Sequence, residues 1–137
     1  MGCYGIGISR LIAAVAACSM DSVGLCWPAH LAPYRLAIIQ ASAQLHQDDV
    51  VFVASSLLGD TRSIIPHDDV LTLLDDRTDM TLPHRVMQNQ MMGIPFTVIL
   101  GKAWLHHKQM DVIRRKDQKE WKHITLEEAQ HIMKSAI

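Results

Sequence analysis

The sequence has few aromatic residues, few cysteines and almost no net charge. Phe, Trp and Tyr make up 5% of the 137 residues, and 13 basic residues against 14 acidic ones give a net charge of −1. A globally basic nucleic-acid binder is therefore excluded, and any phosphate contact has to come from a local patch. The three cysteines, Cys3, Cys18 and Cys26, stand at no metal-ligand spacing. Their odd number favours a reduced, intracellular protein over a disulfide-rich secreted one.

Long hydrophobic runs are also missing. The longest apolar run near the start, residues 11–18, is far shorter than the ~20 residues that a membrane-spanning helix needs, so we expect no membrane contact. Arg10 followed by LIAAVAAC does look like the basic and apolar regions of a secretory or lipoprotein signal. A secreted or lipidated small domain therefore stays open as an alternative interpretation.

Enough apolar sequence is present for one folded domain. The chain has a mass of 15.4 kDa and 49% of its residues are hydrophobic. A chain of this size buries roughly two thirds of its surface on folding, which offsets the entropy of ordering it. The length excludes a complete large multidomain enzyme.

The first 34 residues predict a strand, a helix and an extended connection. Glycines alternate with larger residues in CYGIGIS, which predicts a strand with one bare face, open to a flat ligand or packed tightly against a helix. A buried or amphipathic helix is predicted over residues 10–18. Pro28 and Pro33 disfavour helix, so residues 23–34 are interpreted as a linker.

Alternating strands and helices are predicted from residue 36 onward. Apolar residues recur every three or four positions after Asp48, which indicates a helix that Asp48 caps and Pro66 ends. Thr81, Pro83 and Gly93 delimit a helix over residues 82–92. The predicted strands are residues 36–39, 70–74, 96–100, 110–115 and 121–124, and a capping box at Thr125 and Glu128 starts the last helix. The pattern predicts an α/β fold with a mixed five-stranded sheet flanked by three helices.

Several segments, taken in order, resemble one known family. GCYGIGISR resembles motif 3 of class II aminoacyl-tRNA synthetases, and WPAHLAPY, LLDDRT and GIPFTVILGK follow it as in the C-terminal region of prolyl-tRNA synthetases. The resemblance is closest to the bacterial and mitochondrial type and covers essentially the whole chain. It implies the end of a catalytic domain over residues 1–22, a linker over residues 23–34 and an anticodon-binding domain over residues 35–137.

The resemblance also implies an ATP contact in a complete enzyme. Arg10 stands at the position of the motif 3 arginine that contacts ATP in the family, with Gly5 and Gly7 on the preceding strand, although Ser9 replaces an acidic residue common in class II sequences. A guanidinium stays charged and holds phosphate oxygens in a fixed fork. The implied reaction joins L-proline to its tRNA, using ATP and magnesium, in a homodimeric full-length enzyme. This chain lacks the motif 2 arginine and the proline pocket, so we expect it to be inactive alone.

Three arginines are candidate readers of the anticodon. The resemblance places Arg85 where related enzymes use a basic side chain to read a guanine, and an arginine pairs with guanine through two hydrogen bonds. Arg77 is the second candidate, with a salt bridge to Asp75 or Asp76 as the alternative. Arg62 is a candidate by position only.

A basic stretch near the C-terminus is a candidate contact for the RNA backbone. Residues 102–122 include seven basic and three acidic residues, and Arg114, Arg115 and Lys116 stand at the turn of the predicted hairpin. A solvated hairpin is the alternative. No carboxylate or cysteine stands near the pair His106 and His107 at ligand spacing, so no metal site is predicted.

Two classes of function stay open at this stage. One is a fragment of a proline–tRNA ligase that binds the tRNA anticodon, and the other is a non-catalytic accessory protein with the same kind of domain. The presence of Arg10 favours the enzyme. Similarity to the organellar type predicts the mitochondrial matrix, or otherwise the cytoplasm. Residues 11–18 are predicted to self-associate or to dock on their own domain, because they are apolar and lack a covering sheet.

Overall fold

The sheet that was predicted from residue 36 onward is present. A computed structural model describes residues 5–28, 31–59 and 72–135. Five strands form one sheet in the order β2-β1-β3-β4-β5, with β1 parallel to β2 and β3, and the last two strands antiparallel. The strands are β1 (Leu36–Gln40), β2 (Thr72–Asp75), β3 (Phe96–Leu100), β4 (Met110–Arg114) and β5 (Lys119–Ile124).

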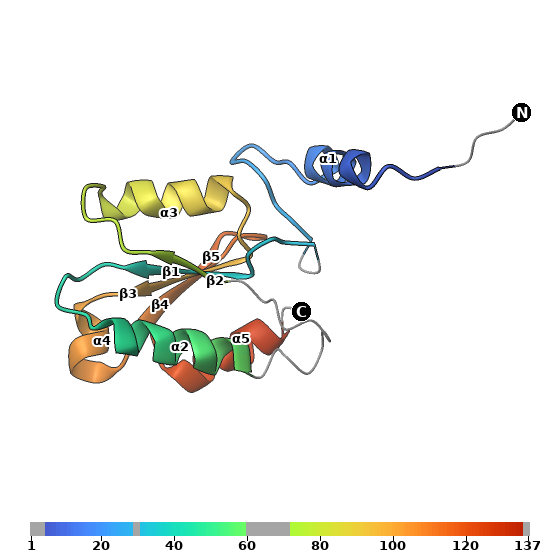
Figure 1. Ribbon diagram of the computed structural model, residues 1–137. Helices are drawn as coiled ribbons and strands as arrows, with labels where there is room; N and C mark the ends of the chain where they lie inside the picture. Colours follow the sequence, from blue (N-terminus) through green and yellow to red (C-terminus); the bar gives the residue numbers. More distant parts are fainter. Residues whose placement is uncertain (1–4, 29–30, 60–71, 136–137) are drawn as a thin grey trace, which may run out of the picture.

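Helices cover both faces of the sheet. In Figure 1, α3 lies on one face, and α2 and α5 lie on the other. The helices are α1 (Ile8–Cys18), α2 (Gln47–Gly59), α3 (Leu82–Met91), α4 (Lys102–His107) and α5 (Leu126–Ser135). The α/β fold with three flanking helices is confirmed, and α4 is an additional short helix that the sequence pattern did not predict.

The two faces of the sheet differ in chemistry. Alternate strand residues such as Ile38 and Val98 pack with α2 and α5 in the apolar core. The opposite face carries buried polar side chains, among them Thr97 and Asp75, and α3 buries Arg85 and Asn89. The side-chain amide of Asn89 is fully buried and has no hydrogen-bond partner. The α3 layer is therefore held by polar contacts more than the α2 and α5 layer is.

The end of α3 and the start of α5 follow the predicted signals, whereas β5 begins at Lys119, two residues before its predicted start. Gly93 has a φ of 76° directly after α3, as expected of a helix stop. Thr125 and Glu128 form the predicted capping box, with the Thr125 N–H donating to Glu128 Oε2 at 2.8 Å. Asp48, however, lies in the first turn of α2 instead of capping it. The predicted end of that helix at Pro66 lies outside the described residues.

The N-terminal predictions need correction. Residues 5–7 are not a strand, and α1 already begins at Ile8. Within the described ranges all strands belong to the one sheet, so this segment has no neighbour with which to pair. None of the residues of α1 is buried, and the helix projects away from the sheet in Figure 1. Docking of this helix on its own domain was therefore wrong, whereas self-association stays a prediction.

Residues 23–34 are not a free linker throughout. Met20 and Leu25 form an isolated antiparallel bridge, and the Leu25 N–H donates to the Met91 carbonyl at 3.0 Å. The beginning of the predicted linker therefore packs against the C-terminal end of α3.

Candidate nucleic-acid interface

A carboxylate at the end of β2 holds two of the predicted arginines. Asp75 is buried and accepts hydrogen bonds from Arg77 Nε at 3.0 Å and from Arg77 Nη2 at 2.9 Å. Arg85 Nε donates to the same carboxylate at 3.1 Å. Since Asp75 ends β2 and Arg85 lies in the first turn of α3, the β2 to α3 connection brings the three charges together.

Arg85 is a buried structural cation. Its side chain is 5% exposed, and it also donates to the Gln40 carbonyl at 3.0 Å and to the Asp75 carbonyl. The fork that would pair with a guanine is thus directed at the ends of β1 and β2. This overturns the expectation that Arg85 is exposed to read a base, because burial behind the strand ends keeps it from RNA.

Arg77 keeps a partly exposed side chain. Its side chain is 39% exposed although it is bonded to Asp75, and Nη1 also lies 3.4 Å from the sulfur of Met80. The predicted salt bridge with Asp75 is confirmed. A contact with a base stays a prediction, for which the exposed part of the Arg77 side chain is available.

The charge pair lowers the pKa of Asp75. Hydrogen bonds from Arg77, opposed by burial and assisted by Arg85, lower the pKa of Asp75 from 3.8 to about 2. The same pairing raises the pKa of Arg77. Asp75 is consequently ionised, and Arg77 is held in a defined direction, throughout the physiological pH range.

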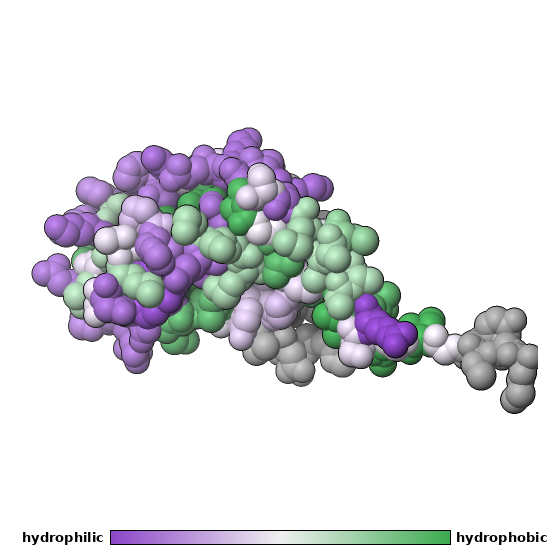
Figure 2. All heavy atoms as spheres, turned by 90° about the horizontal axis from the view of Figure 1, so that it is seen from above, coloured by the Kyte–Doolittle hydropathy of each residue, from purple (hydrophilic) through white to green (hydrophobic). Residues whose placement is uncertain are grey.

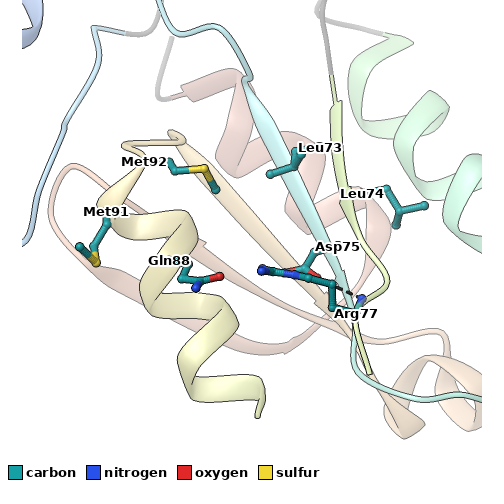
Figure 3. A pocket seen from close by; sticks show the side chains of 7 residues that line it. All are labelled: Leu73, Leu74, Asp75, Arg77, Gln88, Met91 and Met92. Atoms are coloured by element: carbon teal, nitrogen blue, oxygen red, sulfur yellow. Dashed lines mark hydrogen bonds and ion pairs between the residues drawn. The ribbon is translucent and has the colours of Figure 1, made fainter. Parts of the chain in front are cut away.

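A pocket lies between β2 and α3 beside these charges. Its volume is about 470 Å³, and its walls combine leucine and methionine side chains with three polar side chains. Figure 3 shows Gln88 from α3 and Arg77 from the end of β2 pointing toward one another. The lining residues are Leu73, Leu74, Asp75, Arg77, Gln88, Met91 and Met92. Met91 and Met92, at the C-terminal end of α3, are 49% and 42% exposed.

The hairpin turn contains one free and two engaged cations. Lys116 is exposed, whereas Arg114 donates to Asp117 Oδ1 at 2.8 Å and lies with its Cζ 5.4 Å from the Trp121 ring centroid. Arg115 is 2% exposed and forms a salt bridge with Asp21. The expected contact between Arg115 and the RNA backbone is contradicted by this burial. Contacts by Arg114 and Lys116 stay predictions.

Sequence reasoning missed Asp21, the partner of Arg115. Asp21 is followed by Gly24, and its carboxylate accepts from the N–H groups of Val23 and Gly24 at 2.8 and 3.0 Å. An aspartate followed three residues later by glycine is a turn signal that was available in the sequence. The pairing of Asp21 with Arg115, 94 residues further along, could not be inferred from the sequence.

The remaining candidates lie at the N-terminus or outside the described ranges. Arg10 and Gly5 are exposed, and a Cβ placed on Gly7 would make only ordinary contacts with the Arg10 side chain, at 3.7 Å. An ATP contact by these residues stays a prediction. Arg62 lies outside the described residues.

The described ranges contain no group of three or more His, Cys, Asp or Glu side chains that is suited to a metal. His106 and His107 have ring centroids 6.2 Å apart, at a tilt of 55°. Nor does any helix in these ranges have the length and apolar character to cross a bilayer.

Comparison with known proteins identifies the domain. Residues 43–136 match the family model described as anticodon binding domain. The chain belongs to this anticodon-binding family. The match starts just before α2 and ends after α5, so it includes all residues that line the pocket.

Proline–tRNA ligases are among the similar proteins. A probable mitochondrial proline–tRNA ligase of Schizosaccharomyces pombe is 32% identical over 122 residues, which are 89% of this chain and 27% of that protein. The Saccharomyces cerevisiae counterpart is 38% identical, over 76% of this chain and 18% of its own length. A proline–tRNA ligase of Picosynechococcus is 33% identical, over 85% of this chain and 18% of its own length. The chain thus spans about a quarter or less of these relatives.

A solved structure has the same fold. Giardia lamblia prolyl-tRNA synthetase in complex with prolyl-adenylate superposes with a TM-score of 0.64 at 19% identity, over 89% of this chain and 25% of that one. At this identity the match supports the fold alone.

Proposed function

We propose that this chain is the C-terminal part of a proline–tRNA ligase and that it binds the anticodon of proline tRNA. The observation that carries the proposal is the partly exposed side chain of Arg77, which Asp75 holds beside the pocket between β2 and α3. Single-stranded loops are recognised by apolar or planar side chains that grip base faces, and by charged groups that bond to base edges. The family match and the resemblance to proline–tRNA ligases support this assignment.

Each part of the pocket has a task in this proposal. Met91, Met92 and Leu73 contact the face of one unstacked base, while Arg77 and Gln88 donate to or accept from its edge. The pocket volume of about 470 Å³ falls in the range of roughly 300–1,000 Å³ that small-molecule sites occupy. Lys116 and Arg114, on the hairpin turn, contact phosphates.

The N-terminal residues serve the ligase reaction in the full-length protein. There Arg10 holds ATP, with Gly5 and Gly7 beside it, and L-proline and ATP are the substrates. The exposed Arg10 side chain is compatible with this task. Because the described residues hold no carboxylate cluster, no step through magnesium is assigned to them. The chain alone is inactive in this proposal.

The full-length enzyme is proposed to be a homodimer of the mitochondrial matrix, with the cytoplasm as the alternative. Mitochondrial ligases from two yeasts support the compartment, although bacterial ligases also match. Import of the full-length precursor into isolated mitochondria tests it.

The decisive experiment is a titration of the chain with proline tRNA and with the same tRNA carrying altered anticodon bases. We expect binding to proline tRNA to be at least about tenfold tighter, since one bidentate base contact contributes about 1–3 kcal/mol. Equal affinity for the two tRNAs contradicts anticodon recognition.

A further inference from the structure

A partly buried salt bridge joins Asp21, shortly after α1, to Arg115 on the hairpin turn. Arg115 Nη1 and Nη2 donate to Asp21 Oδ2 and Oδ1 at 2.8 and 2.6 Å, and its Nε donates to the Gln90 carbonyl at 2.7 Å. The arginine side chain is 2% exposed and the aspartate side chain 40%. A two-pronged contact of this kind fixes direction as well as distance. Arg115 therefore ties residue 21 both to the hairpin turn and to the C-terminal end of α3.

Two glycines bring the backbones at this junction into contact. A Cβ on Gly24 would lie 2.7 Å from the Met91 carbonyl oxygen, and a Cβ on Gly93 would lie 2.7 Å from the backbone of Leu25. Both glycines have positive φ values, 150° and 76°, which other residues rarely adopt. The segment over residues 19–26 is thus in close backbone contact with the end of α3.

The α1 helix depends on this segment for its placement. It contributes no buried residue, and Figure 2 shows its apolar side chains gathered on the arm that projects from the rest of the molecule. The helix ends at Ser19, whose N–H donates to the Val15 and Ala16 carbonyls and whose carbonyl accepts from the Cys26 N–H at 2.8 Å. The direction of α1 is therefore set where the chain turns back through residues 19–26.

We propose that Arg115 is a positioning residue, which through Asp21 holds α1 at a fixed orientation to the anticodon-binding domain. The inference rests on the proposed function in one respect. If α1 and Arg10 belong to the ATP-binding part of a ligase, the Asp21 to Arg115 salt bridge sets the geometry between that part and the RNA-binding part. Buried and already bonded, Arg115 acts on this geometry and not on RNA.

The test measures distances between spin labels in the intact chain. One label is placed on the exposed Cys18 at the end of α1 and the other on Cys introduced by Glu127→Cys in α5, with Cys3→Ser and Cys26→Ser as background. We expect Arg115→Met and Asp21→Asn to broaden the distance distribution about twofold, because the junction then acts as a hinge. Arg115→Lys should broaden it less, since it keeps the charge but loses the fork.

A matched control is Arg114→Met. It removes a salt bridge of the same kind on the neighbouring residue, which does not involve residues 19–26, and it should leave the distribution unchanged. A label pair within the domain, at Glu127→Cys and Asp76→Cys with Cys18→Ser added to the background, should keep its distance in every variant and so reports whether the domain is folded.

Unchanged distributions in Asp21→Asn and Arg115→Met overturn the proposal, and so does equal broadening in Arg114→Met. If Arg115→Met fails to fold, Asp21→Asn alone decides, because the Asp21 side chain is partly exposed and its replacement leaves the bond to Gln90 in place. The measurement needs no RNA. Its failure would leave anticodon binding untouched, whereas equal titrations with both tRNAs would leave the salt bridge untouched.

Discussion

At the scale of single residues, one carboxylate gives two arginines opposite roles. Asp75 fixes Arg85 inside the molecule, where its exposed side-chain fraction is 5%, and fixes Arg77 at the surface, where the fraction is 39%. The sequence shows two similar basic residues eight positions apart. Only the position of each side chain relative to the strand ends separates a structural cation from one that is available to RNA.

Replacement of Asp75 tests this arrangement through its pH dependence. The folded pKa of about 2 lies below the unfolded value, so the stabilisation is complete above about pH 4 and is lost as the pH falls toward 2. The lowered pKa of Asp75 corresponds to about 2 kcal/mol of stability that is present at neutral pH and lost in acid. Urea unfolding between pH 7 and pH 2 should therefore show a smaller acid loss in Asp75→Asn than in the parent chain. At pH 7 the free energy of unfolding of Asp75→Asn should be about 3 kcal/mol lower than that of the parent chain, because Arg85 stays buried without its charged partner. A parallel pH profile in the two proteins would contradict the assignment.

Replacement of Arg77 tests base recognition. Arg77→Met should weaken binding of proline tRNA about tenfold or more and bring it close to the affinity for an altered anticodon. Its cost in the free energy of unfolding should be about 1 kcal/mol, less than that of Asp75→Asn, because the Asp75 carboxylate keeps Arg85 as a partner. The measurement is fluorescence titration with both tRNAs.

The matched control is Lys122→Ala on β5, the strand at the opposite edge of the sheet. This exposed cation should affect both tRNAs alike. If Arg77→Met still binds proline tRNA more tightly than the tRNA with the altered anticodon, Arg77 does not take part in base recognition.

At the scale of elements, two helix starts with threonine differ in the bonds they form. Thr125 and Glu128 exchange hydrogen bonds at the start of α5, whereas Thr81 precedes α3 without a side-chain cap bond. Thr125→Ala should therefore lower the free energy of unfolding by about 1 kcal/mol. Thr81→Ala should leave it nearly unchanged, and the two are compared by urea denaturation. Equal losses would show that the bond geometry at residue 125 contributes nothing.

Elements with both a periodic pattern and punctuation were predictable from the sequence. Phe96–Leu100 is a continuous apolar run and was predicted to the residue, and α3 was predicted within one residue, between Thr81 and Gly93. The short α4 was not, because Lys102–His107 offers no side-chain cap and a single buried residue, Trp104. The predicted strand before α1 failed because pairing depends on neighbours that the sequence does not reveal.

The candidate site was predictable in part. The DDR sequence at the end of β2 indicated a charged cluster, and the salt bridge of Arg77 with Asp75 followed from their spacing. The burial of Arg85 and Arg115 did not follow, since it depends on Gln40, Gln90 and Asp21, which lie far away in the sequence. Tertiary partners decide which cations remain free, and composition alone overcounts them.

At the scale of the whole molecule, engaged cations limit the electrostatic attraction of RNA. Of the seven basic residues between positions 102 and 122, Arg115 is buried, and Lys108 and Arg114 are paired with Asp49 and Asp117. We therefore expect a shallow salt dependence of proline tRNA binding, with a slope of log affinity against log salt near about −2, corresponding to about three neutralised phosphates. Binding titrations between low and moderate salt measure this slope. A slope as steep as about −5 would require a larger basic surface elsewhere.

The unequal faces of the sheet have a consequence for how the molecule opens. The face under α2 and α5 is packed with apolar side chains. The α3 face contains the unpaired side-chain amide of Asn89 and the buried ion pair of Asp75 and Arg85. A buried amide without a hydrogen-bond partner destabilises the folded state by about 1–3 kcal/mol. When α3 separates from the sheet, the amide can form hydrogen bonds with water and this cost disappears. Local fluctuations should therefore start at α3, whose backbone amides would exchange their hydrogens with solvent sooner than those of α5. The α3 layer, which borders the pocket between β2 and α3, is then also the layer that should open most readily to admit a nucleotide.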